Sequence, residues 1–146
     1  MLSNASKYAV RAVLFLADKS DESTKFSAKT IGEELEIPVY FIAKLLQQLA
    51  KAGLVSSTKG PKGGFYLSDE NLKNNACQIL HEIDGEDVFS HCFMGLPRCG
   101  DKNPCPVHHI VSPFKDKLMT KFQKQSIKEL SDEIDENGMY LSLKDS

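Results

Sequence analysis

The chain has 146 residues, of which 41% are hydrophobic and 26% are charged, and its formal net charge is −2. This length allows one compact domain or a small domain with an appendage, and it excludes a large two-domain enzyme. No apolar run approaches the ~18 residues of a membrane span. The N-terminal stretch MLSNASKYAVRAV lacks the basic-then-apolar pattern of a secretory signal, so we expect a cytoplasmic protein with no membrane partner.

The charge is distributed unevenly along the chain. Residues 1–66 contain nine Lys or Arg and six Asp or Glu, which gives a net charge of +3. Residues 67–146 contain nine Lys or Arg and fourteen Asp or Glu, which gives a net charge of −5. A total near neutrality is compatible with nucleic-acid binding if one face of the N-terminal half collects the positive charge.

The first 35 residues predict two helices. Residues 4–18 place apolar side chains at helical spacing, and Ser3 or Asn4 can cap this helix. A polar connector leads to a second, short helix over 28–35, which Ser27 can cap.

A third helix is predicted directly after a tight turn at Glu36 and Ile37. Pro38 is expected at the first helical position, where its missing N–H costs nothing. The helix extends to about Ala52, and Gly53 ends it. Its expected buried residues are Phe41, Leu45, Leu46 and Leu49.

Two short β-prone runs follow, at 55–58 and 65–67, with the turn KGPKGG between them. Such a pattern predicts a β-hairpin. Helix, short helix, turn, helix and hairpin is the element order of a winged helix-turn-helix, whose third helix enters the major groove of DNA. The predicted fold is therefore mainly α with a small β-hairpin wing.

Most of the residues expected to contact DNA are the first ones of the third helix and those at the tip of the wing. Lysines there would neutralise phosphates, and glycines would let the backbone approach DNA closely. A protein-interaction module is the alternative, but a turn with two lysines and three glycines has no packing purpose. The predicted DNA-binding residues are Ser27, Lys29, Pro38, Val39, Tyr40, Ala43, Lys44, Lys59, Gly60, Lys62 and Gly63.

A fourth helix is predicted over 72–83, ended by Asp84 and Gly85. It contains Cys77, which has no nearby cysteine in the sequence, so we interpret Cys77 as a structural residue.

The next segment has the spacing C-x6-C-x5-C-x2-H, formed by Cys92, Cys99, Cys105 and His108. Three thiolates and one imidazole suit zinc or an iron–sulfur cluster. Structural zinc sites usually contain a C-x2–4-C pair, which is missing here, so the wider spacing favours a cluster. A protein without metal, whose thiols form a disulfide or act as a redox switch, is the third alternative.

The C-terminal part predicts a dimerisation helix and a short last helix. Residues 113–124 carry a narrow apolar stripe on a charged helix, which is more typical of an interhelical interface than of packing on the same domain. Ser126 and Glu129 form a capping box that begins the last helix, and the tail from Asn137 is expected to be loose. The predicted dimerisation residues are Phe114, Leu118, Met119 and Phe122.

These elements divide the chain into four segments. Residues 1–85 form the predicted DNA-binding domain, and 86–108 form a cysteine-rich, cluster-binding loop. Residues 109–136 contain the dimerisation helix and the terminal helix, and 137–146 form the tail.

Nearly the whole chain resembles the Rrf-two type (IscR/NsrR-like) of bacterial transcription regulators. The resemblance is carried by KYAVRAVLFLA, by IPVYFIAKLLQQLAKAGLVSSTKGPKGGFYL and by CFMGLPRCGDKNPCPVH. It implies a homodimer with a long dimerisation helix, an iron–sulfur cluster in the loop before that helix, and binding to palindromic operators in double-stranded DNA.

The resemblance also implies roles for single residues. Cys92, Cys99 and Cys105 match the family's cysteine ligands, and His108 matches the histidine that completes a [2Fe–2S] site in the assembly regulators. The nitric-oxide branch uses an N-terminal Asp for a [4Fe–4S] cluster, but Lys7 stands at that position, which favours [2Fe–2S]. Two features depart from the family: the first cysteine gap is six residues instead of five, and Ala43 replaces a Glu of the recognition helix.

The sequence thus predicts a DNA-binding regulator, not an enzyme, whose operator affinity depends on a cluster that senses iron, redox state or nitric oxide. We expect purification in air to remove the cluster. Its assembly would order residues 92–108 and move the dimerisation helix relative to the wings. The alternatives are a cluster-free or thiol-based repressor, a small redox or electron-transfer module, and a zinc-stabilised interaction protein.

Overall fold

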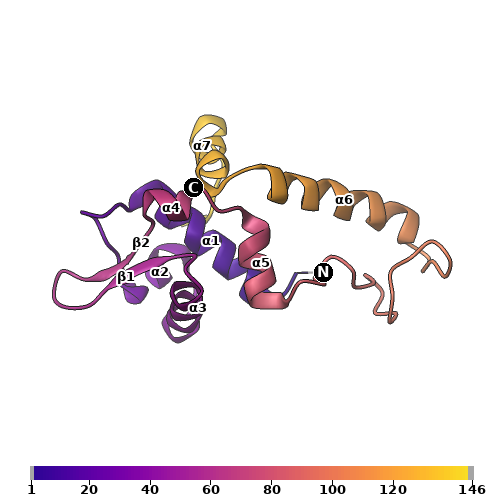
Figure 1. The fold of residues 1–146 in the computed structure, drawn as a ribbon, viewed down its shortest axis with the longest axis horizontal. Helices are drawn as coiled ribbons and strands as arrows, with labels where there is room; N and C mark the ends of the chain where they lie inside the picture. Colours follow the sequence, from indigo (N-terminus) through magenta and orange to yellow (C-terminus); the bar gives the residue numbers. More distant parts are fainter. Residues whose placement is uncertain (1, 145–146) are drawn as a thin grey trace.

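The structure, a computed structural model that describes residues 2–144, is mainly helical and carries a two-stranded antiparallel hairpin (Figure 1). This confirms the predicted fold class. In chain order the elements are α1 (Asn4–Lys19), α2 (Ala28–Leu35), α3 (Val39–Lys51), β1 (Ser56–Thr58), β2 (Gly64–Tyr66), α4 (Asp69–Leu72), α5 (Ala76–Asp84), α6 (His108–Lys124) and α7 (Ile127–Asn137).

Helix α1 forms the centre of the body. It begins at the cap Ser3, whose side chain accepts from the N–H of Ser6, and it contacts α2, α3, α5 and α7. Ala12 and Leu16 on α1 are fully buried, as are Ile31 of α2 and Leu46 of α3. Burying a leucine side chain contributes about 1.5–3 kcal/mol. This core fixes the position of α3 relative to the rest of the body.

The turn between α2 and α3 depends on a close backbone approach. The N–H of Ile37 donates to the carbonyl of Gly32 at 2.9 Å, and a Cβ on Gly32 would lie 2.8 Å from the carbonyl oxygen of Ile37. Glu36 adopts a left-handed conformation with φ of 56°. Pro38 is the N-cap residue with ψ of 130°, so α3 begins at Val39. The prediction of Pro38 as the first helical residue was wrong by one position.

The buried face of α3 was mostly predicted correctly. Leu45, Leu46 and Leu49 are buried, whereas Phe41 is only half-buried and stacks edge-on against Tyr8, with ring centroids 5.5 Å apart. Ile42 is fully buried and was missed.

The hairpin forms the predicted wing, with Ser57 paired to Phe65 in antiparallel register. Its second strand is extended by a bridge to Phe26, where the two residues exchange backbone hydrogen bonds of 3.0 and 2.7 Å. Gly64, with φ of 149°, permits this approach, because a Cβ there would lie 2.8 Å from the carbonyl oxygen of Phe26. The base of the wing is therefore attached to the connector between α1 and α2.

The predicted fourth helix over 72–83 is in fact two helices, so that prediction was wrong. The chain leaves α4 after Leu72 and starts α5 at Ala76. Asn75 caps α5 through a capping box, in which its side chain accepts from the N–H of Gln78 while the Gln78 side chain accepts from the N–H of Asn75. An asparagine favours such a cap over a helix interior, which explains the break.

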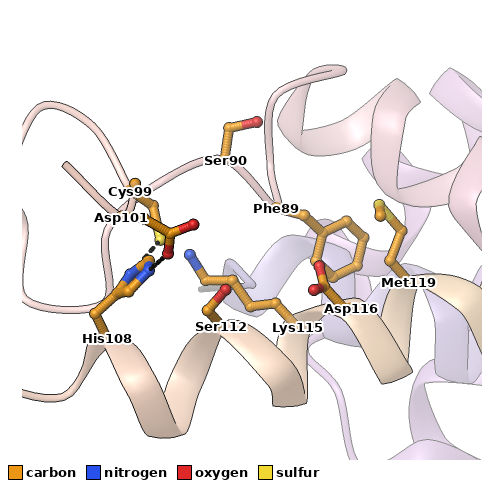
Figure 2. A pocket seen from close by; sticks show the side chains of 10 residues that line it. Phe89, Ser90, Cys99, Asp101, His108, Ser112, Lys115, Asp116 and Met119 are labelled. Carbon is orange, nitrogen blue, oxygen red and sulfur yellow. Dashed lines mark hydrogen bonds and ion pairs between the residues drawn. The ribbon is translucent and has the colours of Figure 1, made fainter. Parts of the chain in front are cut away.

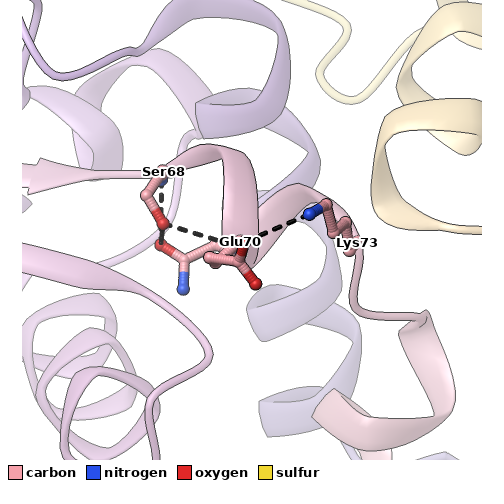
Figure 3. A network of polar contacts seen from close by, with 4 residues as sticks. Ser68, Glu70 and Lys73 are labelled. Carbon is pink, nitrogen blue, oxygen red and sulfur yellow. Dashed lines mark hydrogen bonds and ion pairs between the residues drawn. The ribbon is translucent and has the colours of Figure 1, made fainter.

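The side chain of Asn71, which is 6% exposed, joins the start of the wing to its end. Its Oδ1 accepts from the N–H of Ser68 at 2.9 Å and from the hydroxyl of Ser56 at 2.6 Å, and its Nδ2 donates to the carbonyl of Gly53 at 3.1 Å. Figure 3 shows the part of this network around Ser68, next to the exposed ion pair of Glu70 and Lys73, whose atoms are 3.1 Å apart.

Helix α6 projects away from the body, and the chain then returns so that α7 packs on α1 (Figure 1). Ser126 caps α7 by accepting from the N–H of Glu129, but the reciprocal bond of the predicted capping box is missing among the described contacts. No helix among residues 2–144 is long and apolar enough to cross a membrane.

The described part of the predicted tail is attached to the body, which corrects the expectation of a loose segment. The Nε of Arg11 donates to the carbonyl of Leu141 at 2.6 Å, and Leu141 packs against the core. Residues 145 and 146 of that tail lie outside the described residues.

We expect Asn71→Ala to lower the free energy of unfolding by about 1–3 kcal/mol, because the Gly53 carbonyl and the Ser68 N–H would lose their partner. Urea denaturation at one fixed protein concentration measures this. The control Glu70→Ala removes only an exposed ion pair and should cost less than about 1 kcal/mol. Equal effects of the two substitutions would contradict the role given to Asn71.

Candidate functional site

The start of α3 presents a mostly exposed surface to solvent. Pro38, Val39, Tyr40 and Lys44 are exposed, Tyr40 to 78%, whereas Ala43 is half-buried. α3 lies with α2 and the hairpin on the part of the body away from the tip of α6 (Figure 1). The predicted base-contacting residues are therefore accessible, and their contacts with DNA stay a prediction.

The tip of the wing is equally open. Lys59, Gly60 and Lys62 are exposed, and the N–H of Gly63 donates to the carbonyl of Gly60 at 2.9 Å. A Cβ on Gly63 would lie 2.3 Å from the carbonyl oxygen of Thr58, so the tightness of this turn requires glycine. The turn holds two ammonium groups on a narrow projection, a shape suited to phosphate contacts.

The beginning of α2 supplies the remaining predicted contacts. Ser27 is exposed and caps α2 by accepting from the N–H of Thr30 at 3.1 Å, and Lys29, the second residue of the helix, is also exposed. Lys25 was not predicted; its Nζ lies 5.0 Å from the ring centroid of Tyr66 on the wing. The ammonium of Lys25 therefore adds positive charge next to the wing.

The four predicted ligands lie at the far end of α6. The segment 86–107 contains turns but no helix or strand, and His108 is the first residue of α6. Cys92, Cys105 and His108 are each 8% exposed, and Cys99 is half-buried.

The structure brings these ligands together as two pairs. The Sγ of Cys99 lies 3.4 Å from the Nδ1 of His108, and the thiol of Cys105 donates to the sulfur of Cys92. Burial opposes ionisation of Cys92, but hydrogen bonds to its sulfur outweigh burial and lower the pKa of this thiol below its ordinary value. Besides the Cys105 thiol, the donors are the backbone N–H groups of Leu96, Met94 and Gly95.

His108 is oriented by a residue that sequence reasoning missed. Its Nε2 lies 2.8 Å from the Oδ1 of Asp101 (Figure 2). Because a carboxylate accepts, Nε2 carries the proton, and the lone pair of Nδ1 faces Cys99. A carboxylate that fixes the tautomer of a ligating histidine is a recurrent second partner at metal sites.

The two pairs do not converge on one centre, since the described residues contain no group of three His, Cys, Asp or Glu side chains arranged to hold a metal ion. The chemistry of the donor set nevertheless fits an iron–sulfur cluster. It consists of three thiols and an imidazole whose Nδ1 faces one of these thiols, and backbone N–H groups point at another sulfur, as they do around cluster sulfurs.

Cys77 stands apart from these ligands on α5. It is 3% exposed, burial raises the pKa of its thiol, and its Sγ lies 3.8 Å from the carbonyl oxygen of Met119. A buried, protonated thiol that contacts α6 suits the structural role predicted for it.

The predicted dimerisation stripe divides between two faces of α6. Phe122 packs against the core of its own chain, and Met119 contacts Cys77 and lines the hollow below the cysteine loop. Phe114 is 53% exposed, Leu118 is half-buried, and Ile110, which was not predicted, is 65% exposed. These last three residues are spaced i, i+4, i+8 and form what we call the outer face of α6.

Comparison with known proteins identifies the family. The family model described as "Rrf2: Iron-dependent Transcriptional regulator" matches residues 2–133, which is most of the chain. The chain belongs to the Rrf2 family. The sequence-based assignment to the Rrf-two type and to transcription regulation is thereby confirmed.

Curated relatives of this Rrf2 protein are themselves transcriptional regulators. A protein of Aquifex aeolicus described as "Putative HTH-type transcriptional regulator" is 32% identical over 132 residues, which cover 89% of this chain and 90% of the relative. The HTH-type transcriptional regulator IscR of Photorhabdus laumondii is 29% identical over 129 residues, covering 88% of this chain and 77% of the relative.

Solved structures share the fold. The structure of CymR from B. subtilis, described as the global cysteine regulator, superposes with a TM-score of 0.69 at 21% identity, covering 90% of this chain and 96% of that chain. IscR of T. potens superposes with a TM-score of 0.68 at 20% identity, and the match covers 96% of this chain and 92% of that chain. The winged-helix architecture of the Rrf2 chain is therefore that of known regulators.

Proposed function

We propose that this Rrf2 protein is a homodimeric, sequence-specific DNA-binding regulator whose operator affinity is controlled by an iron–sulfur cluster bound to Cys92, Cys99, Cys105 and His108. The observation that carries the proposal is the placement of three thiols in one loop directly before the imidazole of His108 at the start of α6, with this imidazole oriented by Asp101 so that its Nδ1 faces Cys99. Such a protein acts by binding, needs no catalytic group, and works in the cytoplasm, where bacterial DNA lies.

The DNA-binding part of the proposal uses α3 and the wing. Tyr40 and Lys44 extend from the start of α3 and would contact base edges in the major groove, while Lys59 and Lys62 would contact phosphates. Two copies related by a twofold axis present two such surfaces, which is why the expected operator is palindromic.

The cluster part of the proposal favours [2Fe–2S] over [4Fe–4S]. One imidazole among three thiolates matches a site that mixes histidine and cysteine ligands, and the free Nδ1 of His108 provides that ligand. When bound, the cluster supplies a group whose occupancy and redox state change with iron, oxygen or nitric oxide.

The signal would reach DNA through α6. To bind one cluster, the pair Cys92 and Cys105 must approach the pair Cys99 and His108, which reorders the loop at the end of α6. Since α6 also carries the outer face proposed for dimerisation, a shift of its first turns changes the separation of the two wings. Operator affinity then differs between the two states of the loop.

A cluster-free, thiol-based regulator is the second candidate. It is favoured by the contact between the side chains of Cys105 and Cys92, which an oxidant could couple without assembly of a cluster. This candidate predicts colourless protein under all conditions, whereas the cluster predicts visible absorption after purification without oxygen.

Lys59→Gln should weaken binding to all DNA sequences about equally and should lower the slope of log K against log salt concentration. The expected change is ~0.9 per lost phosphate contact, and about twice that per dimer. Titrations at several salt concentrations measure it. The control Lys128→Gln removes an exposed lysine from α7, outside the wing and the recognition helix, and should leave the slope unchanged. An unaltered slope for Lys59→Gln would refute the wing assignment.

Phe114→Asp should convert the dimer into monomers, because it places an unpaired charge in the outer face of α6. Light scattering gives the mass directly, and DNA affinity should fall with it, since one half-site supplies only part of the binding free energy. Thr120→Asp adds the same charge to a polar, exposed position of α6 and should remain dimeric. A dimeric Phe114→Asp variant would assign dimerisation to another surface.

His108→Cys should still bind a cluster but with a lower reduction potential, because a thiolate replaces the imidazole, and His108→Ala should lose the cluster quickly. The control His109→Ala changes the next residue, which is exposed, and should leave the visible spectrum and the cluster lifetime unaltered. If the alanine variants at 108 and 109 behave alike, His108 is not a ligand.

A further inference from the structure

A lysine is buried beside the cysteine loop. Lys115 lies two turns into α6 and is only 3% exposed, although lysine is rarely fully buried unless it is paired. Its Nζ donates a hydrogen bond to the carbonyl of His91, the residue directly before Cys92. Figure 2 shows its amine extending from α6 toward the loop that carries Cys99 and Asp101.

The ammonium of Lys115 lacks a compensating negative charge. Among the described residues, no carboxylate oxygen lies within 4 Å of its Nζ, and its described hydrogen-bond partner is a neutral carbonyl. Asp101 and Asp116 line the same hollow, but the Asp101 carboxylate is bonded to His108, and neither carboxylate forms a described ion pair with Lys115. Burying a cation is unfavourable unless an anion or several hydrogen bonds repay the lost hydration.

The hollow next to Lys115 is where such an anion would lie. It has a volume of about 330 Å³, and its lining includes Cys99, His108 and Ser112 together with Lys115. Two of the four proposed ligands thus face the same space as the buried ammonium (Figure 2). Three thiolates outweigh the positive charge of an oxidised [2Fe–2S] or [4Fe–4S] core, and reduction adds one more negative charge.

We propose that Lys115 is the counter-ion of the cluster site and the strut that attaches the backbone before Cys92 to α6. Only the counter-ion role rests on the proposed function; the attachment of the backbone to α6 does not. As counter-ion, Lys115 stabilises the reduced, more negative site more than the oxidised one. As strut, it limits the distance between the first cysteine ligand and the helix that begins with His108.

Three variants separate the two roles. Lys115→Gln removes the charge and shortens the donor, and Lys115→Arg keeps the charge. The matched control Lys117→Gln removes one positive charge from an exposed position of the same helix, two residues away. Circular dichroism and thermal unfolding of each metal-free variant establish that it is folded.

In protein purified without oxygen, Lys115→Gln should shift the equilibrium between reduced and oxidised cluster about tenfold toward the oxidised form, which is ~59 mV for one electron. It should also lose the cluster about tenfold faster. Lys115→Arg and Lys117→Gln should keep the wild-type potential. If folded, cluster-bound Lys115→Gln keeps the wild-type reduction potential, the counter-ion role is overturned. An equally large decrease of the reduction potential in Lys117→Gln would also overturn it.

Hydrogen–deuterium exchange of the metal-free protein tests the strut without any cluster. Residues 88–95 should exchange faster in Lys115→Gln than in the wild type and in Lys117→Gln, because the bond to the His91 carbonyl is lost. If residues 88–95 exchange equally fast in Lys115→Gln and in the wild type, Lys115 does not attach this backbone to α6. If the wild-type chain binds no cluster at all, the proposed function and the counter-ion role fail together. The exchange experiment still tests whether Lys115 attaches the backbone before Cys92 to α6.

Discussion

Between Cys92 and Cys105 the cysteine loop contains no buried residue, so the shape of this stretch depends on a few contacts with the first turns of α6. Phe93 and Met94, the large apolar residues after the first cysteine, are exposed, and the segment 86–107 contains no helix or strand. His108 and Lys115 on α6 provide the main attachments, through Cys99 and Asp101 and through the carbonyl of His91. A loop with so few attachments can adopt a second arrangement at low cost, which a sensor requires.

Because α6 carries both these attachments and the outer face proposed for dimerisation, the two proposed functions of the C-terminal half share one rigid element. The body contacts α6 through α5, where Cys77 meets the carbonyl of Met119. A rearranged loop would therefore alter the geometry of the proposed dimer without disturbing the core around α1. The wings would move as rigid units, which is how a small change at one site becomes a change in half-site spacing.

Local signals predicted α1, α2, α3 and the hairpin, because caps, apolar periodicity and turn residues lie within each segment. They failed over 72–83, where periodicity continued across a break that the cap Asn75 creates. The spacing of the cysteines and of His108 was enough to predict them as ligands, and that role stays a prediction. Asp101 and Lys115 were not, since an acidic loop residue and a helical lysine become informative only when tertiary structure brings them against His108 and His91.

The most direct test of cluster control compares operator affinity in a single preparation before and after the cluster is removed. DNA selected by the oxygen-free protein from a random pool serves as the operator, and a chelator removes the cluster from half of the sample. We expect the two halves to differ in Kd by about 5–150-fold at fixed salt, and Cys99→Ala to match the chelated half. Equal dissociation constants for the coloured and the colourless protein would contradict it.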